Sequence, residues 1–284
     1  MSPKTVLVTG CSAGGIGAAV AIALAQRGHH VFATARDVSK IPSCLSELEN
    51  VTPLRLDVAS ADSVAQAAQA VATSGRGLDV LLNNAGAGYA MPLLEIDISK
   101  AQKLYDVNLW GPIRMVQAFA DMLIASRGRI VNISSVGAVV NTPWIGTYAS
   151  SKAALTNLSE TMRLELAPFG VTVTTVMAGI VDSHFHDNDV DFALPSNSRY
   201  APIEEIIAGW ASGKSKPKGC TAAQFAESIT DGVILKGTGM AFTGPYAGST
   251  KFISKWAPQA LSDMALSYNQ GLSELATRVN KTSE

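Results

Sequence analysis

Charge is sparse in this sequence, and neither sign is in excess. The 284 residues include 22 Lys and Arg against 23 Asp and Glu, which gives a formal net charge of −1. Proteins that bind nucleic acid through its phosphates carry a basic surface, so the composition excludes an electrostatic footprint of that kind. The only basic cluster is Lys214, Lys216 and Lys218, which we interpret either as a solvated loop or as a contact for an anionic substrate.

Cysteine and histidine are also scarce. The three cysteines, Cys11, Cys44 and Cys220, are odd in number and irregularly spaced, so no disulfide framework follows and a reducing cytosol is favoured. One segment gathers four side chains of metal-ligating types, namely His184, His186, Asp187 and Asp189. A zinc site needs three or four ligands that a helix or tight loop holds in place, and this segment has neither pattern. We therefore predict a solvated segment and no metal.

Long apolar runs are missing as well. No stretch of about 18 apolar residues occurs, so no spanning helix is expected. An apolar strand begins at Thr5, which leaves no room for a signal peptide and predicts a cytoplasmic protein. Hydrophobic residues nevertheless make up 47% of the chain. This content suits one large domain over residues 1–284 better than two small ones.

Short apolar segments alternate with segments of helical periodicity over most of the chain. Strands are predicted over residues 5–9, 30–34, 52–57, 78–83, 129–134, 171–176 and 240–243. Helices are predicted from residue 16 to Gly28, over 62–73, in a long stretch that ends near 124, and over 148–167. This alternation predicts an α/β fold of the Rossmann type. A doubly wound parallel sheet carries helices on both faces and binds its ligand at the carboxyl ends of the strands.

The periodicity weakens after Ser183. We predict a substrate lid over residues 183–220, with a helix near 202–211, and a further helix over 221–235. The tail over residues 248–284 is predicted to be helical, with a break at Pro258.

A glycine-rich turn over residues 9–17, with the sequence TGCSAGGIG, follows the first strand and opens the first helix. A glycine-rich motif indicates dinucleotide binding only when it follows a strand and begins a helix, as it does here. Glycines let the backbone approach a pyrophosphate, and the helix N-terminus offers free N–H groups to it. The turn therefore predicts a nucleotide cofactor.

A second pattern is the pair Tyr148 and Lys152, which are four residues apart and project from one face of a helix. The ammonium is expected to favour the phenolate and so to lower the Tyr148 pKa toward neutrality. Ser134 and Ser135 end a strand thirteen residues earlier. Neighbouring strand residues face opposite sides of a sheet, and the spacing to Tyr148 selects Ser135 as the functional serine, while strand-end capping is the alternative.

In this order the motifs resemble the short-chain dehydrogenase/reductase family over roughly residues 4–245. The matching residues are the turn at 9–17, Asp57-Val58, Asn83-Asn84-Ala85-Gly86, Asn108, Ser135, Tyr148 with Lys152, and 179–183. Two departures stand out. The turn is one residue longer, which leaves its phosphate donors open, and Ala178-Gly179 replaces the family's usual Pro-Gly. Both departures, together with the long tail, are similar to the branch that contains acyl-dihydroxyacetone-phosphate reductases.

The resemblance implies roles for the catalytic residues. Tyr148 is the acid that protonates a carbonyl oxygen as hydride arrives, and Ser135 polarises that oxygen. Lys152 holds the nicotinamide ribose and lowers the Tyr148 pKa, and Asn108 shapes its helix and supports a proton relay through water. Hydride addition creates an alkoxide, so donors aimed at the oxygen are what this reaction needs. The implied cofactor-binding residues are Gly10, Ser12, Gly15, Ile16, Gly17, Arg36, Asp57, Val58, Asn84, Ala85, Gly86, Tyr148, Lys152, Gly179, Val181 and Ser183.

The end of the second strand favours NADP(H) over NAD(H). NAD sites place a carboxylate at this strand end, whereas here Ala35 is followed by Arg36, whose guanidinium fork matches a 2′-phosphate. Asp37 keeps NAD open, because one step of register would turn its carboxylate inward. Asp57 resembles the family's contact to the adenine amino group, and helix capping is its alternative.

These observations predict an NADPH-dependent carbonyl reductase, or the reverse alcohol oxidation. The alternatives are a non-redox dehydratase, isomerase or cyclase on the same fold, and a cofactor-binding regulator without turnover. The substrate is predicted to be fairly large and apolar, such as a lipid, a steroid or a polyketide-like molecule. Five aromatic residues either line its cleft or belong to the core: Trp144, Phe185, Phe192, Tyr200 and Trp210.

We also predict a homodimer or homotetramer that pairs the helices near 102–124 and 148–167. These helices carry more apolar residues than one sheet face covers, and Met115, Ala118 and Ala154 are expected to point outward. In the alternative, the tail covers these faces and leaves a monomer that touches lipid. The residues of that lipid contact would be Phe252, Ile253 and Trp256.

Overall fold

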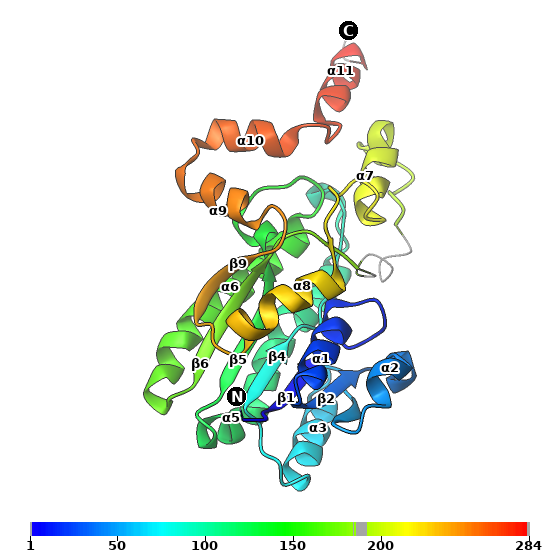
Figure 1. The fold of residues 1–284 in the computed structure, drawn as a ribbon. Coiled ribbons are helices and arrows are strands. Elements are labelled where there is room, and N and C mark those ends of the chain that lie inside the picture. The colour runs from blue at the N-terminus through cyan, green and yellow to red at the C-terminus, as the bar shows by residue number, and fades with distance from the viewer. Residues whose placement is uncertain (1, 184, 186–191, 283–284) are drawn as a thin grey trace.

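The computed structural model describes residues 2–183, 185 and 192–282, and its centre is a parallel sheet of seven strands (Figure 1). The strands are β1 Thr5–Thr9, β2 His30–Ala35, β3 Val51–Arg55, β4 Val80–Asn83, β5 Arg129–Ser135, β6 Thr172–Ala178 and β9 Gly239–Thr243. Their spatial order is β3-β2-β1-β4-β5-β6-β9, and every neighbouring pair is parallel. The predicted doubly wound fold is confirmed.

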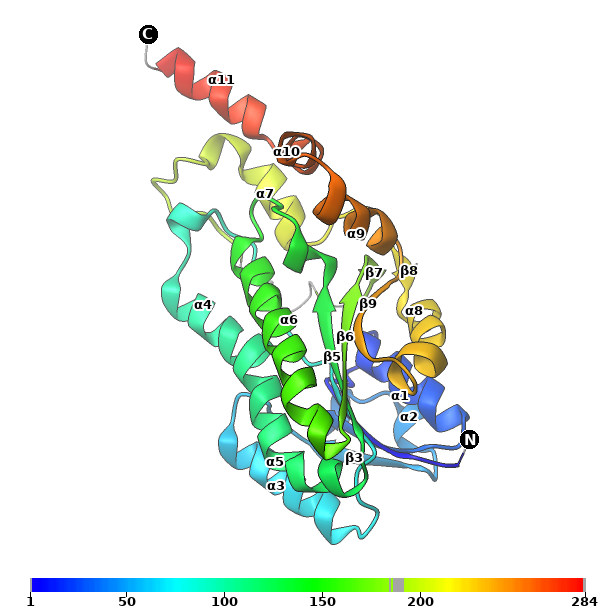
Figure 2. The ribbon, with the colours of Figure 1, turned by 90° about the vertical axis from the view of Figure 1, so that its left-hand side faces the viewer.

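Helices cover both faces of this sheet. The helices are α1 Ile16–Gln26, α2 Ser43–Ser46, α3 Ala61–Thr73, α4 Ile98–Tyr105, α5 Gly111–Ala125, α6 Gly146–Leu166, α7 Glu204–Ala211, α8 Ala222–Ile229, α9 Ala247–Trp256, α10 Gln259–Ser267 and α11 Leu272–Thr282. Helices α1 and α8 lie on one face of the sheet, and α3 and α5 lie on the other (Figure 2). Side chains of α1 and α8 pack with Val6 and Val8 of β1, and those of α3 and α5 pack with Leu7. The alternation of side chains along a buried strand produces these two cores.

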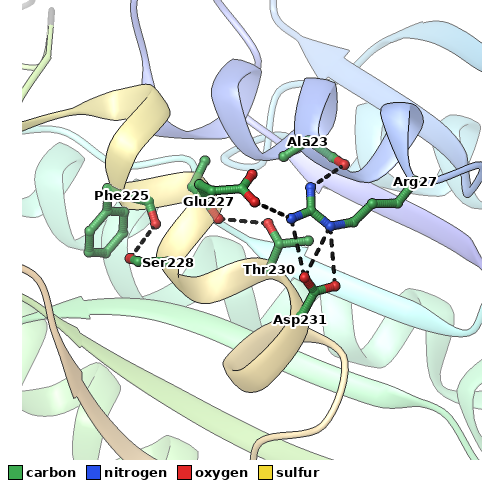
Figure 3. A network of polar contacts seen from close by, with 8 residues as sticks. Ala23, Arg27, Phe225, Glu227, Ser228, Thr230 and Asp231 are labelled. Atoms are coloured by element: carbon green, nitrogen blue, oxygen red, sulfur yellow. Dashed lines mark hydrogen bonds and ion pairs between the residues drawn. The ribbon is translucent and has the colours of Figure 1, made fainter.

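An ion-pair network ties α1 to α8 (Figure 3). The Arg27 guanidinium at the end of α1 donates to Ala23 O at 2.9 Å, to Glu227 Oε1 at 2.6 Å and to Asp231 Oδ1 at 3.1 Å. Glu227 and Asp231 are one turn apart, so both carboxylates reach the same fork. The network raises the Arg27 pKa and sets the helix that follows the glycine turn against α8.

The long helical stretch predicted to end near residue 124 is interrupted. A π-helical turn, Asp106–Trp110, separates α4 from α5, and Pro112 stands in the first turn of α5. Proline has no N–H to continue the ladder of the preceding helix, and π turns of this kind are frequent at functional sites. The outward orientation predicted for Met115 is wrong, because its side chain is fully buried against the sheet.

The two ends of the predicted lid are joined. Val181–Asp182 (β7) pairs in parallel with Cys220–Thr221 (β8). Lys216 Nζ donates to Asp182 Oδ1, and Gly219 N donates to the same oxygen at 3.3 Å. Of the basic cluster, Lys214 and Lys218 are exposed, whereas Lys216 is held in this ion pair. The residues at the two ends of the predicted lid are therefore held together by strand pairing and by the contacts of Asp182.

The predicted metal-ligating group lies outside the described residues, because His184, His186, Asp187 and Asp189 are not among them. Within residues 2–183, 185 and 192–282, no three His, Cys, Asp or Glu side chains lie close enough to hold a metal ion. In the same part of the chain, no helix is both long enough and apolar enough to cross a membrane.

The tail leaves the sheet at its carboxyl end and runs away from it (Figures 1 and 2). Pro258 separates α9 from α10, as predicted, and a second break at 268–271 separates α10 from α11. Helix α9 packs against β9 and the turn Val136–Val139, and α11 packs against the turn Ala201–Ile203. These contacts lie away from the outer sides of α5 and α6, so they do not support a tail that covers those helices.

Candidate active site

The glycine turn is held by the residues that follow β4. Asn84 Nδ2 donates to Thr9 O at 2.8 Å and to Gly10 O at 3.2 Å. The Thr9 hydroxyl oxygen in turn accepts from the backbone N–H groups of Asn84 and Ala85, both at 2.9 Å. Asn83 points elsewhere, because its side chain is buried and donates to Asn132 Oδ1 at 2.9 Å. Asn84 thus positions the turn, and Asn83 belongs to the core.

Two glycines make the close approach of turn and helix possible. Gly10 has a φ of +75°, and a Cβ on Gly17 would lie 2.4 Å from both Gly10 O and Asn84 Nδ2. Gly15 is the N-cap of α1, and no side chain among the described residues caps the helix, so its first N–H groups, from Ile16 onward, are left for a ligand. A helix N-terminus of this kind suits a pyrophosphate, which is the group the turn was predicted to bind.

Beside the turn, the end of β2 distinguishes Arg36 from Asp37. Arg36 is exposed, whereas the Asp37 carboxylate accepts from Ser39 N at 3.0 Å and from Ser39 Oγ at 2.7 Å. These hydrogen bonds lower the Asp37 pKa, and they hold the carboxylate in the turn formed by residues 37–39. An open cavity of about 640 Å³ adjoins this turn and is lined by Ser12, Ala13, Val38, Ser39, Lys40, Ile41, Pro42, Ser43 and Ser46. Of the residues that line this cavity, the sequence predicted Ser12 but not Ser39 or Lys40. The only signal for these two was their position just after Arg36.

Asp57 and Val58 follow β3 rather than ending it. Asp57 Oδ1 accepts from Ala59 N at 3.0 Å, while Ser60 is the N-cap of α3, so the helix-capping alternative for Asp57 is wrong. The Val58 side chain is buried, and a Cβ on Gly111 would lie 2.9 Å from its Cγ2. Only the backbone of Val58 is left to meet a ligand.

Ser135 and Tyr148 meet at the carboxyl end of β5. Tyr148 lies in the first turn of α6 and is half-buried. Its ring lies near the Ser135 side chain, because a Cβ on Gly137 would lie 3.4 Å from Ser135 Oγ and 3.9 Å from Tyr148 Cε1, and Ser135 Oγ itself accepts from Gly137 N at 3.0 Å. Ser134 lies on the other side of the strand, where its hydroxyl contacts Thr156 Oγ1 at 2.7 Å and Lys152 O at 3.1 Å. The structure thus brings the predicted serine, and not its neighbour, to Tyr148.

Lys152 is buried one turn further along α6, and its Nζ donates to Ile133 O at 2.9 Å. Burial lowers the pKa of the ammonium to about 8. Burial also raises the Tyr148 pKa, which the hydrogen bond with Ser135 opposes. The expected lowering of the Tyr148 pKa by Lys152 is therefore wrong in this structure, because desolvation outweighs the polar contact and the ammonium is bonded to strand β5.

Asn108 connects the π turn to α6 and to the loop after β4. Its Oδ1 accepts from Ala87 N at 2.8 Å, and its Nδ2 donates to Ala87 O and to Ser151 Oγ, both at 3.0 Å. A Cβ on Gly86 would lie 3.3 Å from Asn108 Oδ1 and 3.4 Å from Lys152 Nζ. Asn108, Gly86 and Lys152 therefore meet at one point, beside the Ser135–Tyr148 pair.

The segment after β6 closes the site from the other side. Gly179 N donates to Thr243 O at 2.8 Å, and a Cβ on Gly179 would lie 2.0 Å from Pro245 O, so this position accepts only glycine. Ala178, which stands where the family has proline, remains paired with β9. Val181 lies in β7, and Ser183 lines an open cavity of about 600 Å³ together with Gly14 of the glycine turn.

Apolar side chains surround Tyr148 on the side away from the glycine turn. The rings of Tyr148 and Phe185 meet edge to face, with centroids 5.6 Å apart. The other four predicted aromatic residues gather in one cluster, whose members are Trp144, Phe192, Tyr200, Ile203, Ile206, Ile207, Trp210, Leu194 and Leu275. Phe192 and Leu194 also pack against a neighbouring cluster that contains Tyr89, Met91 and Tyr148.

The geometry agrees with comparisons to known proteins. The family model described as short chain dehydrogenase matches residues 4–192. The chain belongs to the short-chain dehydrogenase/reductase family. Among its relatives, short-chain dehydrogenase ptmH of Penicillium ochrochloron is 41% identical over 274 residues, which cover 96% of this chain and all of that protein.

A second relative supports the predicted branch of this dehydrogenase/reductase family. The NADPH-dependent 1-acyldihydroxyacetone phosphate reductase of Schizosaccharomyces pombe is 42% identical over 209 residues, 72% of this chain and 70% of that protein. Among solved structures, a short chain dehydrogenase of Burkholderia cenocepacia in complex with NADP has a TM-score of 0.73 and 26% identity, with 93% of this chain and 97% of that chain covered. An alcohol dehydrogenase of Thermococcus sibiricus complexed with 5-hydroxy-NADP has a TM-score of 0.70 and 27% identity, with coverages of 86% and 97%.

Proposed function

We propose that this chain is an NADPH-dependent carbonyl reductase that interconverts a ketone and a secondary alcohol. The observation that carries the proposal is the Ser135–Tyr148 pair at the carboxyl end of β5, where both side chains lie within 4 Å of the place of a Gly137 Cβ and Lys152 is bonded to the same strand. Two hydroxyl groups directed at one place are what a carbonyl oxygen needs as it becomes an alkoxide.

The chain's own residues supply the proton and the polarisation. Tyr148 donates its phenolic proton to the substrate oxygen, and Ser135 donates a hydrogen bond to the same oxygen. Burial raises the Tyr148 pKa, so at neutral pH the phenol carries the proton that a general acid donates. Lys152 Nζ and Asn108 Oδ1 both lie next to Gly86, within 3.4 Å of the place of a Cβ there, and we propose that these two groups take part in returning a proton to Tyr148. The nicotinamide, when bound, supplies the hydride.

Several features of the site support NADP(H) as the cofactor. The glycine turn and the uncapped start of α1 fit a pyrophosphate, and Lys152 would hold the nicotinamide ribose. Arg36 is exposed just after β2, and the Asp37 carboxylate accepts hydrogen bonds from Ser39, which leaves it less available to a ribose 2′-hydroxyl. Two solved relatives of similar fold carry NADP or a derivative of it.

The substrate and assembly are proposed on more general grounds. The rings beside Tyr148 favour a fairly large apolar carbonyl compound over a short alcohol. We also propose a cytoplasmic homo-oligomer that pairs α5 and α6 of two copies, since such closed symmetric assemblies are the commonest kind.

One assay tests the proposed reaction. Purified protein is mixed with NADPH or NADH and a panel of ketones from acetone to fused-ring ketones, and oxidation of the reduced nicotinamide is followed together with formation of the alcohol. We expect oxidation with NADPH that stops in the Ser135→Ala variant. NADPH binding with no ketone reduced would favour a regulator, and a product formed without consumption of NADPH would favour a non-redox enzyme.

A further inference from the structure

Trp144 occupies an unusual position next to the catalytic helix. Its φ is +71°, a left-handed conformation that is rare for a bulky residue and persists only where the surroundings hold it. It stands four positions before Tyr148, so at most about 14 Å of extended chain joins the two residues. Its carbonyl oxygen accepts from Met91 N at 2.7 Å, and Met91 belongs to the apolar cluster that contacts Tyr148.

The group that holds the Trp144 indole comes from the tail. Indole Nε1 donates to the backbone oxygen of Gln270 at 3.1 Å, across 126 positions of sequence, and both residues are buried. The indole ring also meets Tyr200 edge to face at 5.6 Å. A hydrogen bond buried among apolar groups is costly to leave unmade, so this contact couples the tail to the rings beside Tyr148.

Gly271 shows how closely the tail approaches. Its φ is +78°, and a Cβ there would lie 2.9 Å from Ile206 Cδ1 and 3.2 Å from Ile203 Cγ2. Leu275 of α11 packs against the same cluster as Ile203 and Trp144. Only a glycine lets the chain turn into α11 while lying against these side chains.

The Gln270 side chain adds a polar group to this apolar surrounding. It is buried, and no donor in the described part of the chain reaches its Oε1. An unpaired buried carboxamide oxygen is costly, and such groups are usually satisfied by water or by a ligand. A hydroxyl group carried by an otherwise apolar ligand has the chemistry to pair with it.

We infer that residues 270–275 of the tail form the far wall of the substrate site, where Trp144 and Gln270 act as specificity-determining residues for an apolar ketone that bears a distant hydroxyl group. This inference rests on the proposed reductase function. The rings and aliphatic chains contact the body of the ketone, Gln270 Oε1 accepts from its hydroxyl group, and the tail sets the position of Trp144.

Steady-state kinetics with three ketones test whether residues 270–275 contact the substrate. Cyclohexanone probes the hydride transfer alone, 2-decalone probes the apolar body, and a 2-decalone with a hydroxyl group on the second ring probes Gln270. We expect Gln270→Met to lower kcat/KM for the hydroxylated decalone by about 2- to 12-fold, which corresponds to one neutral hydrogen bond, and to leave the other two ketones unchanged. Gln259→Met, at an exposed position of α10, is the matched control. Equal values for both decalones in wild type and variant would overturn the role of Gln270.

Gly271→Ala tests the coupling through Trp144. It should raise KM for both decalones while kcat with cyclohexanone and the NADPH dissociation constant stay within about twofold, because the catalytic residues are not displaced. Gly248→Ala is the control, since a Cβ there meets no atom within 4 Å. Equal loss of kcat/KM for all three ketones, or no difference from Gly248→Ala, would overturn the proposal.

A spectroscopic readout separates this inference from the proposed reaction. In a variant whose only tryptophan is Trp144, with phenylalanine at positions 110, 210 and 256, Gly271→Ala is expected to shift the Trp144 emission to longer wavelength as water reaches the indole. The emission responds whether or not any ketone is reduced. An unchanged spectrum would contradict the coupling, whereas a shift without activity on any ketone would keep the coupling and reject the reductase.

Discussion

Lys152 donates a hydrogen bond of 2.9 Å from Nζ to the carbonyl oxygen of Ile133, two residues before Ser135 on the same strand. The bond ties helix α6 to strand β5, so that Tyr148 and Ser135 are held in one relative position. The ammonium is buried there, and desolvation lowers its pKa from 10.5 to about 8. This cost makes Lys152 a residue whose effect on stability depends on pH.

Replacing Lys152 by Met should reveal that dependence in the protein without ligand. Between the two pKa values of about 8 and 10.5 the unfolded chain binds a proton that the folded chain has lost, so the wild type gains stability relative to the variant as the pH rises. The gain over the whole window is about 3 kcal/mol. Urea unfolding at several pH values measures it, with the exposed Lys103→Met as control. A stability difference that does not change with pH would contradict the buried ammonium.

Tyr148→Phe should abolish turnover while NADPH affinity stays nearly unchanged. The ring keeps its packing against Phe185, and only the acidic proton is lost. General acid catalysis contributes about 10²- to 10⁴-fold, so a rate loss in that range or larger is expected in ketone reduction. Tyr246→Phe, at an exposed position, should keep full activity. If the Tyr148→Phe variant retained more than about a tenth of the rate, Tyr148 would not be the acid.

Arg36→Ala should weaken NADPH binding far more than NADH binding. A charge-assisted hydrogen bond to a phosphate contributes about 1.5–3 kcal/mol, which corresponds to roughly 10- to 150-fold in the dissociation constant. Isothermal titration with both cofactors measures the two losses, and Arg76→Ala, which lies in the loop before β4 at the opposite end of the sheet, is the control. Equal losses for both cofactors, or tight NADH binding by the wild type, would reject NADP selection by Arg36.

Gly17→Ala should damage both folding and cofactor binding. The added Cβ would stand 2.4 Å from Gly10 O and Asn84 Nδ2, so the glycine turn must move away from Asn84. Overpacking of this kind costs about 1–3 kcal/mol, which thermal unfolding measures alongside NADPH affinity. Gly232→Ala, where a Cβ meets nothing within 4 Å, should change neither quantity. Normal NADPH binding by the Gly17→Ala variant would show that the turn does not hold the cofactor.

A homo-oligomer through α5 and α6 should be sensitive to Ala154 on α6. Ala154→Arg places a long charged side chain where two helices of facing copies would approach, so the oligomer is expected to dissociate. Light scattering at micromolar concentration reads the mass, which is 29.6 kDa for one chain. Leu261→Arg on α10 should leave the oligomer intact. A wild-type mass near that of one chain would contradict the proposed homo-oligomer.

The order of the elements and the chemistry of the turn were readable from the sequence because their signals are local. Strand β1 and helix α1 differ in hydrophobic period, and the glycines between them mark the turn that joins them. The choice of Ser135 over Ser134 was equally local, since it needed only the alternation of side chains along a strand.

Orientation around helices was less predictable. Met115 was expected to point outward and is fully buried, because it stands four residues before Phe119 and shares the face of α5 that packs on the sheet. The direction of Asp37 also depended on a single step of register, and a side-chain hydrogen bond to Ser39 decided it. The direction of Asp37 does not follow from periodicity, because it depends on a contact between two neighbouring side chains.

The sequence by itself determined the family and the fold and selected Ser135, Tyr148 and Lys152 as the candidate catalytic residues, because each depends on residue types at short and regular spacings. Only the tertiary structure decided which group the Lys152 ammonium contacts, and that burial raises rather than lowers the Tyr148 pKa. The same is true of the contact between Trp144 and Gln270. Long-range contacts and desolvation depend on how distant segments pack together, and no local pattern in the sequence carries that information.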